Sequence, residues 1–394
     1  GLAIAVAVAL FGVGFWKAQD MKIGDSEPGV PELRPESRYN RDAVLISEKF
    51  SLGVDVLTIV GETIPNACTE NYNVMETIDR FAWNMANVEG VQKVITLPMV
   101  AKVVNSGWNE GNVKWQILPR DHFVMRQAIG DIDTDTGLLN TDCSAMPIMV
   151  FTTDHRAETI ARIVNRVKEL REELDIGEVS FGIDNPVLED MAEAPEEATA
   201  ESLRFRLATG NVGVMAATNE DIAAAEKPML LLVYGSIILL CLITYRTLLG
   251  TLTIVLPLVV VSTLAEALMA IYGIGLKVNT LPVVALGVGI GVDYGIYIYN
   301  RLDILLKEGF TLREAYYRTL RLTGRAVIFT GFTLGAGVGT WIFSPLQFQA
   351  DMGILLSFIF LANMVGAIVL LPALVRWLMM RKRNTLVEIP LEAV

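Results

Sequence analysis

Five apolar runs, each long enough to cross a lipid bilayer as a helix, constrain the fold of this chain more than any other feature. They lie at residues 229–245, 250–272, 278–299, 327–343 and 353–379. A helix that spans a bilayer needs roughly 17 to 25 such residues. A sixth run, "GLAIAVAVALFGVGFW", opens the chain without the basic flank and cleavage site of a signal peptide. The sequence therefore predicts six transmembrane helices, the first of them (residues 1–18) cut short at its start.

Positively charged residues indicate how these helices cross the membrane. Eleven Lys and Arg residues fall on one side of the predicted bundle, whereas the short loops on the other side contain only Lys277. Lys and Arg are enriched in cytoplasmic loops. We therefore expect residues 300–326 and the tail at 385–394 to be cytoplasmic. Residues 19–227, which precede the five helices within 228–384, then lie outside the cytoplasm.

The external segment 19–227 alternates strand and helix patterns, as a two-layer domain does. The patterns predict strands at 54–62, 91–98 and 146–153 and helices at 73–88 and 156–174. The last strand has two candidates, 178–183 and 203–208, and either gives β-α-β-β-α-β, the ferredoxin-like arrangement. The acidic segment 189–201 is interpreted as a solvated loop or helix, because nothing in it fixes the ligand geometry of a cation site.

Charge and histidine spacing exclude several classes of function. The segment from residue 17 to 227 carries 36 Asp and Glu residues against 20 Lys and Arg, which argues against nucleic acid as a partner. The two histidines, His122 and His155, show neither metal-ligand nor catalytic-triad spacing. His155, at the start of a helix, is expected at the surface. We therefore expect no metal, no cofactor and no enzymatic activity.

Two of the three cysteines, Cys68 and Cys143, lie in the external segment. An oxidising compartment allows a disulfide between them, and a pair of buried free thiols is the alternative. Cys241 falls within a transmembrane run and is interpreted as a packing residue.

The stretch "ALGVGIGVDYGIYIYNRL" places a single carboxylate, Asp293, within an apolar run. A charge at bilayer depth costs at least about 2.5 kcal/mol on insertion scales, so it is seldom found without a partner or a function. Tyr294 and Tyr297 follow on the same helix, and Thr330 and Thr333 lie in the next run. A carboxylate in apolar surroundings can gain and lose a proton when those surroundings change. We therefore expect these five residues to form a proton relay.

Glu266 is the second charged residue within the transmembrane runs. It lies one to two turns from the outer end of its helix, where a carboxylate reaches water, and it is the secondary candidate for this role.

Glycines recur every four residues on two of the predicted helices. They are Gly287, Gly291 and Gly295 on one helix and Gly331, Gly335 and Gly339 on the next. Small residues let helices approach closely in a membrane. We interpret all six as packing residues, and we expect the dense packing to place Asp293 inside the bundle.

The two segments "GVGIGVDYGIYIYNRL" and "RAVIFTGFTLGAGVGTWIFS", with a ferredoxin-like external domain after the first helix, resemble one half of a resistance-nodulation-division (RND) transporter. The nearest branch comprises the exporters related to the MMPL (mycobacterial membrane protein large) and hopanoid-transporter families. In such transporters an Asp-Tyr pair forms a proton relay at the centre of the bundle, which the resemblance assigns to Asp293 and Tyr294. Thr330 and Thr333 match the polar residues of the facing helix only loosely.

The resemblance implies a transporter in the bacterial inner membrane whose external domain is a periplasmic porter domain. It would use the proton-motive force to move or export a hydrophobic or lipid-like molecule, with protons as the coupling ion. RND transporters have two halves and twelve helices, whereas six are predicted here. The truncated first helix and the basic tail predict that the chain corresponds to the C-terminal half. The implied partners are membrane lipids, the substrate, a second six-helix half, further copies in an oligomer and periplasmic proteins. The sequence contains no G-x-x-x-x-G-K-[ST] signature, which would indicate a nucleotide as the energy source.

Two other functions share this architecture. A Patched-like or sterol-sensing receptor would bind lipid without net transport, and proton-dependent flux in vesicles separates it from a transporter. A Sec-associated motor for protein translocation would bind a peptide instead of a lipid.

The orientation can be tested by cysteine labelling of intact cells. A membrane-impermeant reagent should modify an engineered cysteine within 19–227 and should leave one within 300–326 unmodified until the membrane is permeabilised. Modification of the 300–326 site in intact cells would contradict the predicted orientation.

Overall fold

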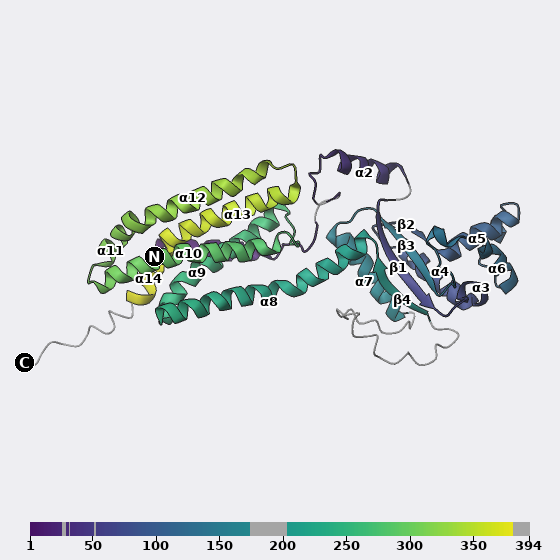
Figure 1. Ribbon diagram of the computed structural model, residues 1–394, viewed down its shortest axis with the longest axis horizontal. Helices are drawn as coiled ribbons and strands as arrows, with labels where there is room; N and C mark the ends of the chain where they lie inside the picture. Colours follow the sequence, from purple (N-terminus) through teal and green to yellow (C-terminus); the bar gives the residue numbers. More distant parts are fainter. Residues whose placement is uncertain (26–28, 31, 51–52, 174–202, 381–394) are drawn as a thin grey trace, which may run out of the picture. The chain divides into compact units, whose positions relative to one another are not determined.

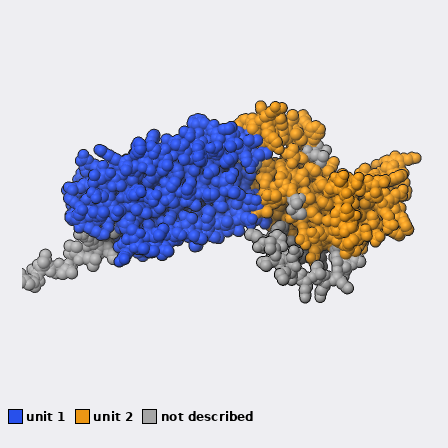
Figure 2. Space-filling view, viewed as in Figure 1, with its two compact units in different colours: residues 1–35, 218–394 blue, residues 36–217 orange. Residues whose placement is uncertain are grey.

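The computed structural model describes residues 1–25, 29–30, 32–50, 53–173 and 203–380. Figure 2 shows its two compact units. Residues 36–217 form one of them, called here the sheet unit, and residues 1–35 with 218–394 form the other, the helical unit. The tail at 385–394, the alternative strand at 178–183 and the acidic segment at 189–201 lie outside the described residues.

The sheet unit contains a four-stranded antiparallel sheet (Figure 1). The strands are β1 (Asp55–Thr63), β2 (Val91–Ile95), β3 (Ala145–Thr152) and β4 (Leu203–Thr209), in the spatial order β2-β3-β1-β4. α4 (Tyr72–Ala86) connects β1 to β2, and α7 (Ala157–Glu173) follows β3. This is the ferredoxin-like order predicted from the sequence, with the later of the two candidate segments as its last strand.

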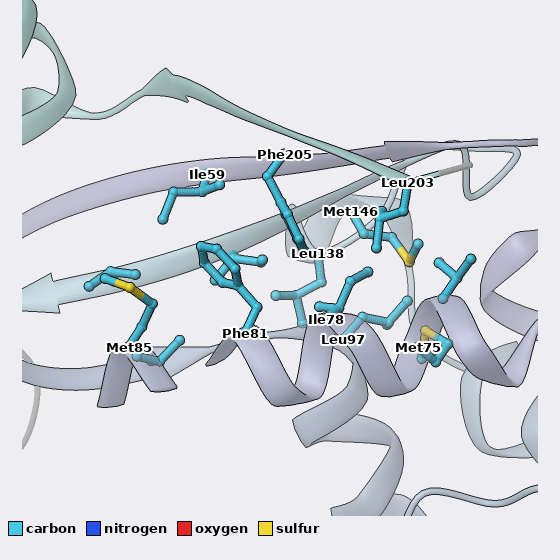
Figure 3. Packing of buried hydrophobic residues seen from close by; sticks show 14 of the residues in the cluster. Ile59, Met75, Ile78, Phe81, Met85, Leu97, Leu138, Met146, Leu203 and Phe205 are labelled. Atoms are coloured by element: carbon cyan, nitrogen blue, oxygen red, sulfur yellow. The ribbon is translucent and has the colours of Figure 1, made fainter. Parts of the chain in front are cut away.

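One hydrophobic core joins the sheet to α4 and α7. Successive strand residues alternate between buried and partly exposed, so one face of β1 and β3 is buried. Figure 3 shows Ile78 and Phe81 of α4 facing the strand residues Ile59 and Phe205. The rings of Phe81 and Phe205 stack with centroids 4.3 Å apart. Because fully burying each such side chain contributes about 1.5–3 kcal/mol, this core is the main source of stability in the unit.

A helical insertion lies between β2 and β3, where no helix is predicted from the sequence; its first helix begins within the last residues of the predicted strand 91–98. It contains α5 (Leu97–Trp108), η1 (Val113–Trp115), α6 (His122–Gly130) and η2 (Thr134–Thr136). Thr96 caps α5 by accepting a bond from the Met99 amide at 3.4 Å. Asp121 caps α6 by accepting bonds from the amides of Phe123 and Val124. Thr and Asp are favoured at this position because their side-chain oxygens accept bonds from the otherwise unpaired first amides of a helix.

A disulfide joins Cys68, in the short helix α3 (Ala67–Glu70), to Cys143, just before β3, with 5.7 Å between the Cα atoms. It cross-links two segments separated by 75 residues. In the adjacent turn the Ser144 hydroxyl donates to Asp142 at 2.7 Å and the Ser144 amide donates at 3.1 Å. These bonds hold the pKa of the Asp142 carboxyl below its ordinary value.

His155 is buried, which corrects the expectation of a surface position. Its exposed fraction is 4%, and its Nδ1 lies 3.0 Å from Oδ2 of Asp55 at the start of β1. The Asn211 amide donates to the other Asp55 oxygen at 2.7 Å. A histidine at the start of a helix can be exposed or can pack against a strand. The pairing of His155 with Asp55 was therefore not predicted from the sequence.

The helical unit contains the apolar helices (Figure 1). Among the described residues, five helical spans are long and apolar enough to cross a membrane. A further apolar helix, α1 (Leu2–Ala18), is shorter. The helices are α8 (Asn211–Tyr245), α9 (Leu248–Tyr272), α10 (Leu281–Lys307), α11 (Leu312–Thr319) with η4 (Leu320–Gly324), α12 (Arg325–Gly339) with η5 (Thr340–Phe343), and α13 (Gln347–Val365) with η6 (Gly366–Leu370), α14 (Leu371–Val375) and η7 (Arg376–Met380). α8 continues past Pro228, at the predicted junction of domain and helix, without a break.

The segment that follows α1 bonds to two loops of the helical unit, so it belongs there and not to the sheet unit. The Gly24 amide donates to the Leu276 carbonyl at 2.8 Å, and the Leu276 amide donates to the Lys22 carbonyl at 2.8 Å. Farther along, the Arg34 guanidinium donates to the carbonyls of Ser344 and Ile342 at 2.8 and 2.7 Å. The sheet unit therefore comprises residues 36–217, within the segment 19–227 that is predicted to lie outside the membrane.

The disulfide should stabilise the sheet unit measurably. A disulfide that closes a loop of this length restricts the unfolded chain and raises the free energy of unfolding by up to about 4 kcal/mol. A reducing agent should therefore lower the unfolding temperature of the wild-type protein, and it should have no further effect on the variant Cys68→Ala/Cys143→Ala. Cys241→Ala is the matched control and should keep the wild-type response to reduction. An unchanged unfolding temperature in the double variant would contradict a stabilising disulfide.

Candidate functional site

One face of α10 carries the three predicted packing glycines. A Cβ atom added at Gly287 would contact Ile359 of α13, and one added at Gly291 would contact Asn363 of the same helix. A Cβ added at Gly295 would lie 3.1 Å from Ile254 of α9. All three glycines are buried. The backbone of α10 therefore approaches its neighbours so closely that a side chain at these positions would displace them.

The glycines of α12 make the corresponding contact with the other side of α13. An added Cβ would lie 2.7 Å from Met364 at Gly331, 3.1 Å from Leu361 at Gly335 and 3.2 Å from Ser357 at Gly339. The Ser357 hydroxyl also donates to the Gly335 carbonyl at 2.9 Å. Helix α13 is thus held between the glycine faces of α10 and α12.

Asp293 lies on the opposite side of α10 from the glycines and is exposed. Successive residues turn by about 100° around a helix, so Asp293, two residues from both Gly291 and Gly295, points away from them. The expectation that glycine packing turns Asp293 into the bundle is therefore wrong for this chain. Leu286, Gly289 and Tyr297 share its exposed face.

Tyr294 and Tyr297 take different positions from each other. Tyr294 is 2% exposed, and its hydroxyl has no hydrogen-bond partner among the described residues. Tyr297 is 58% exposed and lies one turn from Asp293 on the same face. Within this chain the structure therefore places Tyr297 beside the carboxylate and turns Tyr294 into the core.

Thr330 and Thr333 are both exposed on α12. The Thr333 hydroxyl donates to the carbonyls of Phe329 and Thr330 of its own helix, at 2.8 and 3.1 Å. The described contacts include no hydrogen bond from either threonine to Asp293. The structure therefore leaves four of the five predicted relay residues exposed and does not join the threonines to the carboxylate.

Glu266 is partly buried on α9. One turn earlier on that helix, Ser262 shares a 2.7 Å hydrogen bond with Tyr234 of α8. The secondary candidate therefore lies in a polar strip between α8 and α9, apart from the exposed face of α10.

Two buried polar residues of α13, Asn363 and Asp351, are not among the predicted site residues. Asn363 is 4% exposed and donates to the Gly287 carbonyl at 3.0 Å, while its Oδ1 has no partner among the described residues. Asp351 is 6% exposed and accepts from the Gln347 amide at 2.8 Å. Asn363 carries no charge that would mark it within the apolar run, and Asp351 precedes the run at residues 353–379.

No group of three or more His, Cys, Asp or Glu residues within the described ranges could hold a metal ion.

The family model described as the MMPL family matches residues 183–385, about half of the chain. The chain belongs to the MMPL family.

Several curated proteins are similar to this MMPL chain. A membrane protein of Methanocaldococcus jannaschii is 22% identical over 82% of this chain and 77% of its own length. The protein-export membrane protein SecF of Pyrococcus furiosus is 38% identical over 27% of this chain and 34% of its own. MmpL3 of Mycobacterium leprae, whose name describes a trehalose monomycolate exporter, is 34% identical over 23% of this chain and 10% of its own.

The part that matches the MMPL model contains α9, α10, α12 and α13, and thus both glycine faces and Asp293. With these relatives and its five apolar spans, the protein is a helical membrane protein with a small sheet-containing unit.

The close approach of α10 and α13 predicts a sharp contrast between two glycines of this MMPL protein. Gly287→Ala should destabilise it by about 1–3 kcal/mol, because the new methyl group meets Ile359, whose branched side chain has little freedom to move. In this chain studied by itself, Gly289→Ala is the matched control: nothing lies within 4 Å of its added Cβ, and alanine favours the helix. Thermal unfolding in detergent measures both, and equal shifts would contradict the packing described.

Proposed function

We propose that this protein is one half of a proton-driven transporter of the bacterial inner membrane. It moves or exports a hydrophobic or lipid-like molecule, and its sheet unit lies in the periplasm. Asp293 carries the coupling proton, and a second six-helix half, on the same or another chain, covers the exposed face of α10.

The position of Asp293 is the observation that carries this proposal. It is the thirteenth residue of the 27-residue helix α10, about 18 Å from its start at 1.5 Å per residue. An exposed carboxylate at that depth would face lipid, at a cost of at least about 2.5 kcal/mol on insertion scales. A covering protein surface with polar groups removes this cost, and a second half would supply one.

The remaining exposed polar residues suit a proton relay under such a cover. Tyr297 adjoins Asp293 on α10, and Thr330 and Thr333 are exposed on α12. Their hydroxyls can both donate and accept a proton. The Tyr294 hydroxyl points into the core of its own half. In this arrangement of the bundle, Tyr294 packs within that half and does not join the relay.

The proton gradient is sufficient to shift the bundle between two states. One proton crossing 100 mV releases about 2.3 kcal/mol. A switch of Asp293 between charged and neutral forms changes which arrangement of the two halves is favoured, because the charged form disfavours apolar surroundings. Movement of one half against the other then exposes the substrate path to each side in turn.

The relatives support transport and leave its cargo open. The name of the M. leprae relative describes a lipid-like cargo, whereas SecF is named for protein export. The 38% identity to SecF keeps protein translocation as the second candidate. Vesicles that contain the complete transporter distinguish the two, since a lipid probe or an unfolded polypeptide can be offered in turn.

Asp293→Asn tests the coupling role directly. The amide keeps the shape of the side chain, cannot titrate and is cheaper to bury than a carboxylate. We expect proton-driven movement of a fluorescent phospholipid in vesicles to fall to background, while expression and unfolding temperature stay near those of the wild type.

Asp303→Asn is the matched control on the same helix. Asp303 pairs with Lys307 at 2.6 Å near the end of α10, outside the proposed relay, so transport should be retained. Wild-type transport by Asp293→Asn with the proton gradient as the sole energy source would exclude Asp293 as the carrier. Glu266 would then be tested in the same way.

A further inference from the structure

Helix α2 (Arg38–Lys49) exposes large apolar side chains that the core of the sheet unit does not use. Tyr39 is 55% exposed, Ile46 is 40% exposed, and Phe50, the residue directly after the helix, is 65% exposed. Among the described residues, none from α2 belongs to the hydrophobic core that joins the sheet to α4 and α7. The apolar surface of α2 therefore needs an explanation other than packing onto the sheet.

These side chains form one stripe along α2. With Ala43 they occupy positions 39, 43, 46 and 50, and this spacing of three and four residues is the period of an amphipathic helix. Leu45 is also exposed, at 53%, but it points to the other side of the helix and is not part of the stripe. That other side carries the charged residues Arg38, Arg41, Asp42, Glu48 and Lys49.

Hydrogen bonds from β2 fix the direction in which the stripe points. The side-chain amide of Gln92 donates to the carbonyls of Ser47 and Phe50, both at 3.0 Å. Asn40 and Ala43, at the edge of the stripe, are buried. Rotation of α2 about its axis would break the Gln92 bonds, so Ile46 and Phe50 remain exposed.

The chain just before α2 is bonded to the end of an apolar span. The Arg34 guanidinium donates to the carbonyls of Ile342 and Ser344, where the span Leu312–Phe343 ends. α2 begins at Arg38, four residues later, and a chain of four residues reaches at most about 14 Å. The covalent chain therefore keeps the start of α2 near the level at which this span leaves the membrane.

A helix with one apolar and one charged side at that level can lie in the plane of the bilayer surface, with its apolar side among the lipid chains. We propose that α2 is such an interfacial helix, and that Tyr39, Ile46 and Phe50 insert into the membrane that holds the protein. Tyr39 suits this position because its ring is apolar and its hydroxyl reaches water. Lys49 can extend its ammonium to lipid phosphates while its methylene groups cover apolar surface.

The consequence is that the sheet unit contacts lipid directly, because Gln92 ties α2 to β2. The inference requires only that the protein spans a membrane. It does not depend on Asp293 as a proton carrier or on the identity of the cargo.

Spin labels on the two sides of α2 test this assignment in nanodiscs. Cys241→Ala removes the free cysteine, and the Cys68–Cys143 disulfide does not react with the label. Ile46→Cys then places a nitroxide on the stripe. Glu48→Cys is the matched control, about 160° away around the helix at 100° per residue. Both positions are exposed, so neither label disturbs a buried contact.

Electron paramagnetic resonance measures how often each label collides with oxygen, which concentrates in lipid, and with a water-soluble nickel chelate. The ratio of oxygen to nickel collisions should be severalfold higher at position 46 than at position 48, and Phe50→Cys should repeat the result for position 46. Equal ratios on the two sides would place the stripe in water and overturn the proposal. Few collisions with either reagent at 46 and 50, with an immobilised spectrum, would show that protein covers the stripe and would also overturn it.

A second pair of variants tests whether the stripe acts as a unit. With the label at position 46, Phe50→Ser should lower the collision ratio, because it removes apolar surface that inserts beside the label. Leu45→Ser is the matched control and should leave the ratio unchanged, since Leu45 lies outside the stripe. Equal effects of the two serine variants would overturn the assignment of this side of α2 to the lipid surface.

Discussion

The close contact between α10 and α13 sets the direction of every functional side chain on α10. Gly287 and Gly291 bring the α10 backbone against Ile359 and Asn363, and the Asn363 amide bonds to the Gly287 carbonyl. A helix held by one face cannot rotate, so the opposite face is fixed as well. Asp293 therefore points out of the bundle, and the chemistry proposed for it depends on what covers that face.

The helical unit combines a tightly packed interior with an exposed face that carries the Asp293 carboxylate. Its glycine faces pack without any hydrophobic driving force between helices in lipid, so shape complementarity and a few buried hydrogen bonds hold it together. Among the described residues, the exposed carboxylate of Asp293 has no hydrogen-bond or ion-pair partner. A second half that covers it would unite packing and proton coupling at one interface, where small movements change the surroundings of the charge.

The sheet unit is stabilised differently, by a hydrophobic core and a disulfide in an architecture that the sequence largely predicts. The alternation in β1 and β3 and the apolar stripe of α4 follow from the periods of strand and helix. The insertion between β2 and β3 could not be predicted in this way. Its helices begin at the polar caps Thr96 and Asp121. The Asn105 side-chain amide joins α5 to the segment that follows it by donating to the carbonyls of Trp115 and Ile117.

The sequence by itself determined the apolar spans, the succession of strands and helices along the external segment and the presence of a carboxylate in an apolar helix, because length, period and charge are local properties. It also located the glycines that pack the bundle. Only the tertiary structure decided that Asp293 and Tyr297 face outward while Tyr294 is buried, and that His155 pairs with Asp55. Those outcomes depend on how each helix is rotated and on which segments meet, and contacts between residues far apart in the chain fix both.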